Sequence, residues 1–131
     1  MDYKPLIRIA LKSRKRAYAP YSKFYVGAVV QTMDNKIYTG CNIENTSYGA
    51  TICAERVAIF NAIANGVKKI KRIVVVADTE KPVIPCGICL QVISELAPNA
   101  EIVLSNLKGE LECVSIKELL PKQFEGVRRN A

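Results

Sequence analysis

The 131-residue sequence contains no histidine. Catalytic triads built on histidine, proton transfer through an imidazole ring and histidine-ligated metal sites are therefore excluded. Acid–base chemistry and metal binding must come from other side chains. The chain has five cysteines and twelve acidic residues, and both types can bind a metal ion.

Long apolar runs are also missing. The longest aliphatic stretch, residues 73–77, is far short of the roughly 20 residues that cross a bilayer. The N-terminus, residues 1–4 (MDYK), has no apolar core of the kind found in secretion signals. An odd number of cysteines without such a signal favours free thiols over disulfides. We therefore expect a cytoplasmic protein with no membrane partner.

The length is that of one domain, and we expect a single domain over residues 1–131. Hydrophobic residues make up 50% of the chain, which is high for so small a soluble monomer. Part of the apolar surface is therefore expected to meet another subunit.

The net charge of +7 raises the question of nucleic-acid binding. Four basic residues recur at helical spacing on one face of the opening segment: Arg8, Lys12, Lys15 and Arg16. A solvated outer helix face explains this pattern better than a polyanion-binding stripe, because the basic face has no interleaved aromatic residues that could stack on bases. The pattern argues against a nucleic-acid partner.

The most informative motif is Cys53-Ala-Glu55, followed further along by Pro85-Cys-Gly-Ile-Cys89. Three thiolates can hold a zinc ion and leave its fourth coordination position to water, which is the arrangement of a catalytic site. Zinc-dependent nucleobase deaminases carry this kind of signature, with a nearby glutamate that shuttles protons. We predict one zinc ion per chain, held by Cys53, Cys86 and Cys89, with Glu55 as general acid/base.

Two other uses of the cysteines remain open at this point. A Cys-x-x-Cys pair also occurs in redox proteins, which do not require the upstream Cys-Ala-Glu. A structural zinc site would need a fourth ligand, which Cys41 or Cys113 could supply. Both lie in strand-like runs, where a free cysteine usually behaves as a small buried hydrophobe. The catalytic arrangement fits the pattern better.

Charge balance at such a site points to Arg56. Three thiolates and Zn²⁺ leave a net charge of about −1, and extra negative charge makes a zinc-bound water harder to ionise. The guanidinium of Arg56 would compensate by donating to the thiolates. The alternative is an ordinary surface arginine on a helix.

Hydrophobic periodicity predicts strands that alternate with helices, and so an α/β layered domain. The segment 53–65 is apolar nearly all round, and we expect it to be buried on more than one side. Helices are predicted over 4–17, 53–65, from about residue 86 onward and just before Pro121. Strands are predicted over 25–32, 36–42, 70–77, 101–104 and 110–114.

Three segments resemble the small homotetrameric cytidine deaminases: 18–28 (YAPYSKFYVGA), 39–56 (TGCNIENTSYGATICAER) and 85–89 (PCGIC). The likeness runs from about residue 8 to Phe124. It implies a three-layer α/β/α sandwich with a mixed five-stranded sheet and a zinc cofactor. It also implies hydrolytic deamination of cytidine and 2′-deoxycytidine to uridine and 2′-deoxyuridine, with release of ammonia, in pyrimidine salvage.

The same resemblance implies roles for further residues by matching position. Asn42 and Glu44 would hold the ribose hydroxyls. Tyr48 and Phe124 match residues that neighbouring subunits contribute, which implies a homotetramer with shared active sites. The positions that match substrate-binding residues within one chain are Phe24, Asn42, Glu44 and Ala54. Gln91 is expected to support the metal ligands without binding the zinc, as is Arg56.

One departure from the family pattern is Leu90, where the family commonly has arginine after Pro-Cys-Gly-x-Cys. Leucine cannot donate a hydrogen bond, but the ligand set is untouched. We expect altered surface or subunit contacts rather than lost activity. Blasticidin-type deaminases share the zinc motif, but the segments around Phe24 and Asn42-x-Glu44 fit the nucleoside enzymes better.

Two other functions compete with deamination of a free nucleoside. A deaminase of polynucleotide cytosine would need an open groove, whereas ribose-gripping residues suggest a closed pocket for a free nucleoside. A non-catalytic, zinc-stabilised RNA-binding module would need no Glu55, and a fourth cysteine would close its metal site.

Overall fold

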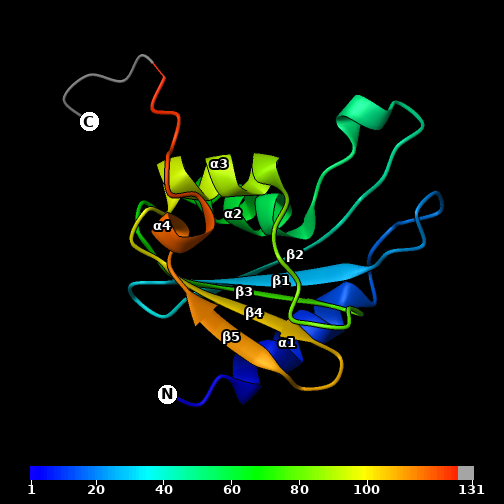
Figure 1. Cartoon of the computed structure of the whole chain (residues 1–131), viewed down its shortest axis with the longest axis horizontal. Coiled ribbons are helices and arrows are strands. Elements are labelled where there is room, and N and C mark those ends of the chain that lie inside the picture. Colours follow the sequence, from blue (N-terminus) through cyan, green and yellow to red (C-terminus); the bar gives the residue numbers. More distant parts are fainter. Residues whose placement is uncertain (127–131) are drawn as a thin grey trace.

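The computed structural model describes residues 1–126, which form a five-stranded sheet between helices (Figure 1). The strands are β1 (Val26–Thr32), β2 (Ile37–Cys41), β3 (Ile70–Ala77), β4 (Glu101–Asn106) and β5 (Leu111–Val114). The helices are α1 (Lys4–Arg14), α2 (Ala54–Ala64), α3 (Gly87–Leu96) and α4 (Ile116–Leu119), with a 3₁₀ turn η1 (Tyr48–Ala50).

The sheet is mixed, with the strand order β2-β1-β3-β4-β5. Strand β3 pairs antiparallel with β1 and parallel with β4, so that Val75 lies between Ala28 and Leu104. All residues of β3 except Lys71 are buried. The continuous apolar run predicted over 70–77 is therefore the central strand, as a strand covered on both faces should be.

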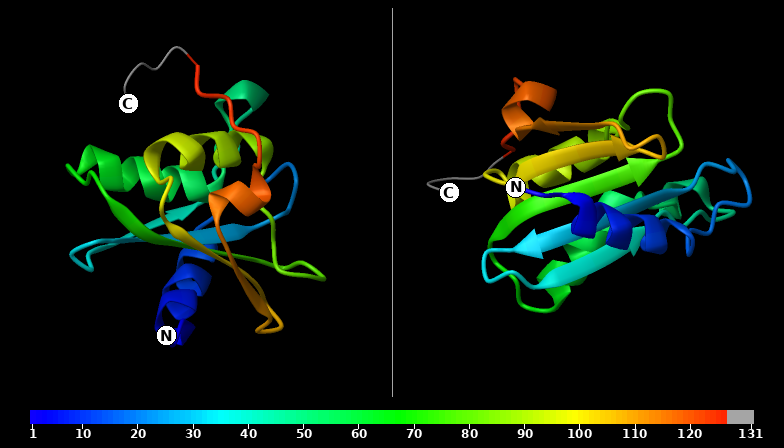
Figure 2. Two further views of the ribbon diagram at one scale, coloured as in Figure 1. Left: turned by 60° about the vertical axis from the view of Figure 1, so that its left-hand side comes forward. Right: turned by 90° about the horizontal axis from the view of Figure 1, so that it is seen from below.

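Two apolar cores lie on opposite faces of the sheet. Ile73, Val75 and Ala77 of β3 pack in the core under α2 and α3. Val74 and Val76, which point the other way, pack with α1. Figure 2 shows α1 on one face and α2 with α3 on the other. The predicted three-layer α/β/α sandwich is confirmed.

Helix α2 buries only one side within the chain. Ala58, Ile59 and Ala62 are fully buried against the sheet, but 42% of Phe60 and 38% of Ile63 are exposed. The expectation that this helix is buried on more than one side is wrong for the single chain. The apolar outer face is available for contact with another subunit.

Gly40 sets how closely β2 approaches the start of α2. A Cβ atom at this position would lie 2.4 Å from the Ala54 carbonyl oxygen and 2.4 Å from the Ala58 nitrogen. No larger residue fits, because both neighbours are backbone atoms. The absence of a side chain therefore brings the first turn of α2 directly onto the sheet edge.

Helix α1 ends at Arg14, three residues earlier than predicted. Ser13 Oγ donates to the Gly40 carbonyl at 2.7 Å, and Arg14 Nε donates to the Tyr25 carbonyl at 3.0 Å. These contacts hold the helix end against the strands and turn the chain toward residue 18. The four side chains of the basic face, Arg8, Lys12, Lys15 and Arg16, are exposed, as a solvated face requires. No helix within residues 1–126 is long and apolar enough to span a membrane.

Candidate active site

Two helix N-termini bring the predicted cysteines together. Cys53 is the N-cap of α2, Cys86 is the N-cap of α3, and Cys89 lies in the first turn of α3. The three sulfur atoms all lie within 4.8 Å of one another, and the Sγ atoms of Cys53 and Cys86 are 3.5 Å apart. The helix ends point their unpaired N–H groups toward this cluster, which favours thiolate over thiol.

The cluster has the geometry that a zinc ion needs. Tetrahedral coordination with Zn–S bonds of about 2.3 Å places ligand sulfurs about 3.8 Å apart, close to the observed separation. Within residues 1–126, these three cysteines are the one group of metal-binding side chains that converges in this way. The donor set therefore fits zinc with three protein ligands.

The other cysteines lie outside the cluster. Cys41 is half-buried in β2, which agrees with a small apolar side chain. Cys113 is exposed on the edge strand β5, so the expectation of a buried role is wrong for this residue. Neither thiol converges with the three sulfurs, so the cysteines do not supply a fourth ligand.

Arg56 approaches the cluster from the first turn of α2, with its Nη2 atom 3.5 Å from the Cys53 sulfur. A hydrogen bond from the Cys89 thiol, together with bonds from Arg56 and Cys86, lowers the pKa of Cys53 to about 5, although burial opposes this shift. Burial alone would lower the pKa of Arg56, but its bonds to the Cys53 and Cys89 sulfurs raise it. The guanidinium therefore stays cationic beside the thiolates.

Glu55 is 4% exposed and lines the same cavity as Cys53 and Cys86. Burial raises the pKa of Glu55 to about 7, and the nearby charge of Cys53 acts in the same direction. A carboxyl group with this pKa can accept and release a proton near neutral pH. Its position on α2, two residues after a cluster cysteine, places the proton carrier next to the sulfurs.

The cavity beside the sulfurs has a volume of about 250 Å³ and contains three residues predicted to bind substrate: Phe24, Asn42 and Glu44. The motif analysis missed several other lining residues. Ser22 and Val26 lie inside the segment 18–28, so that segment carried a signal for them. Thr51 and Ile52 likewise lie inside the segment 39–56. Val83 and Ile84 follow from the fold alone.

Asn42 and Glu44 also form hydrogen bonds to the main chain of residues 21–26, which lie beside the cavity at the start of β1. Asn42 Nδ2 donates to the Phe24 carbonyl at 2.7 Å, and its Oδ1 accepts from the Val26 N–H at 2.9 Å. Glu44 Oε1 accepts the N–H groups of Tyr21 at 2.9 Å and of Ser22 at 3.1 Å. Both side chains are at least nine-tenths buried. They therefore have fixed orientations before any ligand arrives.

Ala54, the first residue of α2, is fully buried and does not line the cavity. Tyr48 and Phe124 do not line the cavity of their own chain; 76% of Tyr48 and 73% of Phe124 are exposed. Tyr48 lies at the tip of the arm formed by residues 43–52, which projects from the sandwich in Figure 1. Gln91 Nε2 donates to the Phe124 carbonyl at 2.9 Å and so holds the C-terminal segment against α3.

Leu90 lies in the core under α2 and α3 and is only 8% exposed. We expected Leu90 to alter contacts at the surface or between subunits. For the surface of the single chain this expectation is wrong, because the side chain is buried. Its side chain packs with the buried apolar residues instead, and the three sulfurs converge regardless.

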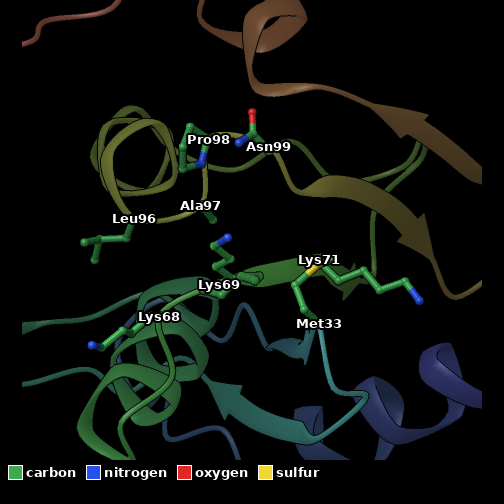
Figure 3. A pocket seen from close by; sticks show the side chains of 9 residues that line it. Met33, Lys68, Lys69, Lys71, Leu96, Ala97, Pro98 and Asn99 are labelled. Atoms are coloured by element: carbon green, nitrogen blue, oxygen red, sulfur yellow. The ribbon is translucent and has the colours of Figure 1, made fainter. Parts of the chain in front are cut away.

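A larger cavity, of about 510 Å³, lies at the start of β3 and is shown in Figure 3. Lys68, Lys69 and Lys71 line it together with residues 96–99, which span the end of α3. Cations near a helix C-terminus stabilise the negative end of its dipole. The lining includes neither a thiol nor a carboxylate. Convergent chemical groups, rather than volume, therefore identify the candidate active site.

Comparison with known proteins points in the same direction. Residues 1–105 match the family described as the cytidine and deoxycytidylate deaminase zinc-binding region. The chain is 50% identical over 125 residues to the cytidine deaminase of Sporosarcina psychrophila, covering 95% of this chain and 92% of that protein. It is 47% identical to the cytidine deaminase of Halalkalibacterium halodurans, with 95% of each chain covered. The crystal structure of cytidine deaminase from Burkholderia pseudomallei matches with a TM-score of 0.91 and 46% identity, covering 95% of this chain and 100% of that one.

Proposed function

Because the chain belongs to the family of zinc-binding cytidine and deoxycytidylate deaminases, we propose that it hydrolyses cytidine and 2′-deoxycytidine to uridine and 2′-deoxyuridine with release of ammonia. The observation that carries this proposal is the meeting of three sulfurs, a buried glutamate and two buried polar side chains around one cavity. In this proposal residues 1–131 act as one catalytic domain in the cytoplasm, in pyrimidine salvage.

Cys53, Cys86 and Cys89 would hold the zinc ion. When bound, zinc supplies a Lewis acid that makes a water molecule acidic enough to react near neutral pH. Glu55 takes a proton from the attacking water and delivers it to N3 of the pyrimidine, while the water oxygen adds to C4. Glu55 then takes the remaining proton from the hydroxyl group on C4 and passes it to the amino group. The C4–N bond breaks, ammonia leaves and the C4=O bond of the product forms.

The cavity beside Glu55 suits a pyrimidine nucleoside. Phe24 offers an aromatic face to a flat base. Ala54, at the start of α2, would contact the base through its main chain. Asn42 and Glu44 offer an amide and a carboxylate to sugar hydroxyls. A cavity of only about 250 Å³, lined by side chains suited to a sugar, favours a free nucleoside over a polynucleotide. The buried Glu55 disfavours a purely structural zinc module.

Purified protein should contain about one zinc ion per chain and should deaminate free cytidine and 2′-deoxycytidine without an added organic cofactor. Metal analysis gives the zinc content, and the fall in ultraviolet absorbance with ammonia release gives the rate. Blasticidin S and a cytosine-containing single-stranded oligonucleotide should react far more slowly. Zinc-loaded protein that releases no ammonia from either nucleoside would exclude the proposed activity.

We further propose a homotetramer in which subunits share active sites. Support comes from apolar side chains that one chain leaves exposed on the outer faces of α2 and α3, including Phe60, Ile63 and Ile88. Tyr48, on the arm formed by residues 43–52, and Phe124, in the segment after α4, are both exposed and would reach cavities of neighbouring chains. Gln91 would support this contact by holding the main chain at Phe124.

Light scattering should therefore give the mass of a tetramer at assay concentrations. Tyr48→Ala should raise KM or lower kcat if this side chain reaches a neighbouring cavity, whereas Tyr38→Phe, a change outside the projecting segments, serves as a control. An active monomer would contradict both the tetramer and the shared sites.

A further inference from the structure

The loop before β1 is held by hydrogen bonds that converge on Ser22 and Glu44, both of which line the cavity. Ser22 Oγ donates to Glu44 Oε2 and accepts the Phe24 N–H at 3.0 Å. The hydrogen bond from Ser22 is the main cause of a pKa of Glu44 below its usual value, although burial opposes the shift. Glu44 is therefore an ionised carboxylate that can only accept hydrogen bonds.

The number of free positions on Glu44 can be counted. A carboxylate has about four lone-pair sites, two on each oxygen. Tyr21 and Ser22 N–H groups fill both sites of Oε1, and the Ser22 hydroxyl fills one site of Oε2. One acceptor site of Glu44 therefore remains free, on Oε2, the oxygen that accepts the hydrogen bond from the Ser22 hydroxyl.

Asn42 offers the complementary group. Its Nδ2 uses one N–H on the Phe24 carbonyl, so one N–H is left over. A single sugar hydroxyl can accept from this N–H and donate to the free site on Glu44 Oε2. The two buried side chains can therefore bind one hydroxyl group as both an acceptor and a donor of hydrogen bonds.

The loop conformation adds a second observation. Lys23, between Ser22 and Phe24, has a φ of +59°, in the left-handed region that a residue with a side chain rarely adopts. Such a conformation persists when surrounding contacts determine it. Ser22, the residue before Lys23, bonds to Glu44 and also accepts the N–H of Phe24, the residue after Lys23. These bonds therefore hold both neighbours of the strained residue.

We infer that Ser22 is a positioning residue for sugar recognition: its hydroxyl orients Glu44 so that one acceptor site faces the substrate. This inference rests on the proposed nucleoside deamination. In this role Ser22 acts on the substrate through Glu44 and not by contact with the reacting atoms. It follows that the effect of Ser22 depends on a sugar hydroxyl being present.

The test compares the kinetics of Ser22→Ala and of the wild type on cytidine and on 2′,3′-dideoxycytidine. The dideoxynucleoside has no hydroxyl group on its sugar ring that could donate a hydrogen bond to Glu44. A hydrogen bond to a charged group corresponds to about tenfold in affinity or more. We expect the KM for cytidine to rise about 5- to 10-fold with kcat within about twofold. The kcat/KM for dideoxycytidine should change less than about twofold. This difference between the two substrates does not depend on the fraction of folded enzyme.

Ser22→Thr keeps the hydroxyl and should restore the cytidine KM. Ser115→Ala, at an exposed serine just before α4, should leave the KM of both substrates unchanged. Calorimetric binding of uridine and 2′,3′-dideoxyuridine gives the same comparison without any chemical step. An equal loss for both substrates, or none, overturns the role of Ser22. Wild-type protein without deaminase activity would instead overturn the proposed function, which separates the two failures.

Discussion

Replacing Glu55 with glutamine is expected to lower kcat by about 10²- to 10⁴-fold, because glutamine has nearly the same shape but cannot carry a proton. The expectation follows from the position of Glu55, which is 4% exposed beside the three sulfurs in a cavity. Within the lining of that cavity, Glu44 is the other carboxylate, and Tyr21 and Ser22 occupy most of its acceptor sites. The site therefore offers no substitute for Glu55.

The Glu55→Gln protein should keep its zinc content and its thermal unfolding temperature, because the cysteines and the buried volume are unchanged. Glu55→Asp is the matched variant: it keeps the carboxyl group but shortens its reach, so it should retain more activity than Glu55→Gln. Glu95→Gln, at an exposed position on α3, controls for the loss of one negative charge. A Glu55→Gln enzyme within tenfold of the wild type would mean that another group transfers the protons.

The fold could be predicted where local pattern and burial agree. The apolar run 70–77 is the central strand, and the helix predicted over 53–65 is α2. Gly66, at a φ of +87°, follows the end of this helix. Helix α1 was predicted three residues too long, because its end is determined by side-chain bonds from Ser13 and Arg14 to distant strands. Such bonds depend on tertiary contacts that periodicity does not contain.

The metal-binding part of the candidate site could be predicted, because it depends on the spacing of cysteines along the chain. The cysteine motifs led to three sulfurs that do converge. Ser22 illustrates the limit, because its partner Glu44 is reached only after two segments fold against each other. The exposure of Phe60 illustrates another limit, because an apolar helix pattern does not distinguish burial within one chain from burial between chains.

Replacing Arg56 with glutamine is expected to weaken zinc binding or activity by about 10- to 100-fold, the usual effect of removing a partner of a metal ligand. The guanidinium lies 3.5 Å from the Cys53 sulfur, so it offsets the negative charge that three thiolates concentrate at the two helix ends. Arg56→Asp should have a larger effect, since it adds an anion where anions are already in excess. Arg8→Gln, on the exposed face of α1, changes the net charge equally and should have no effect.

The measurement that separates a role in metal binding from a surface role is zinc retention as a function of pH. Protons compete with zinc for thiolates. Without the hydrogen bond from Arg56, which helps to lower the pKa of Cys53, thiols hold their protons to higher pH. The pH at which half of the zinc is lost should therefore shift upward in Arg56→Gln and further upward in Arg56→Asp, and activity should decrease in the same order. Unchanged retention and rate in Arg56→Gln would leave the N-termini of α2 and α3 as the source of charge balance, because they are the other positive groups that the fold directs at the sulfurs.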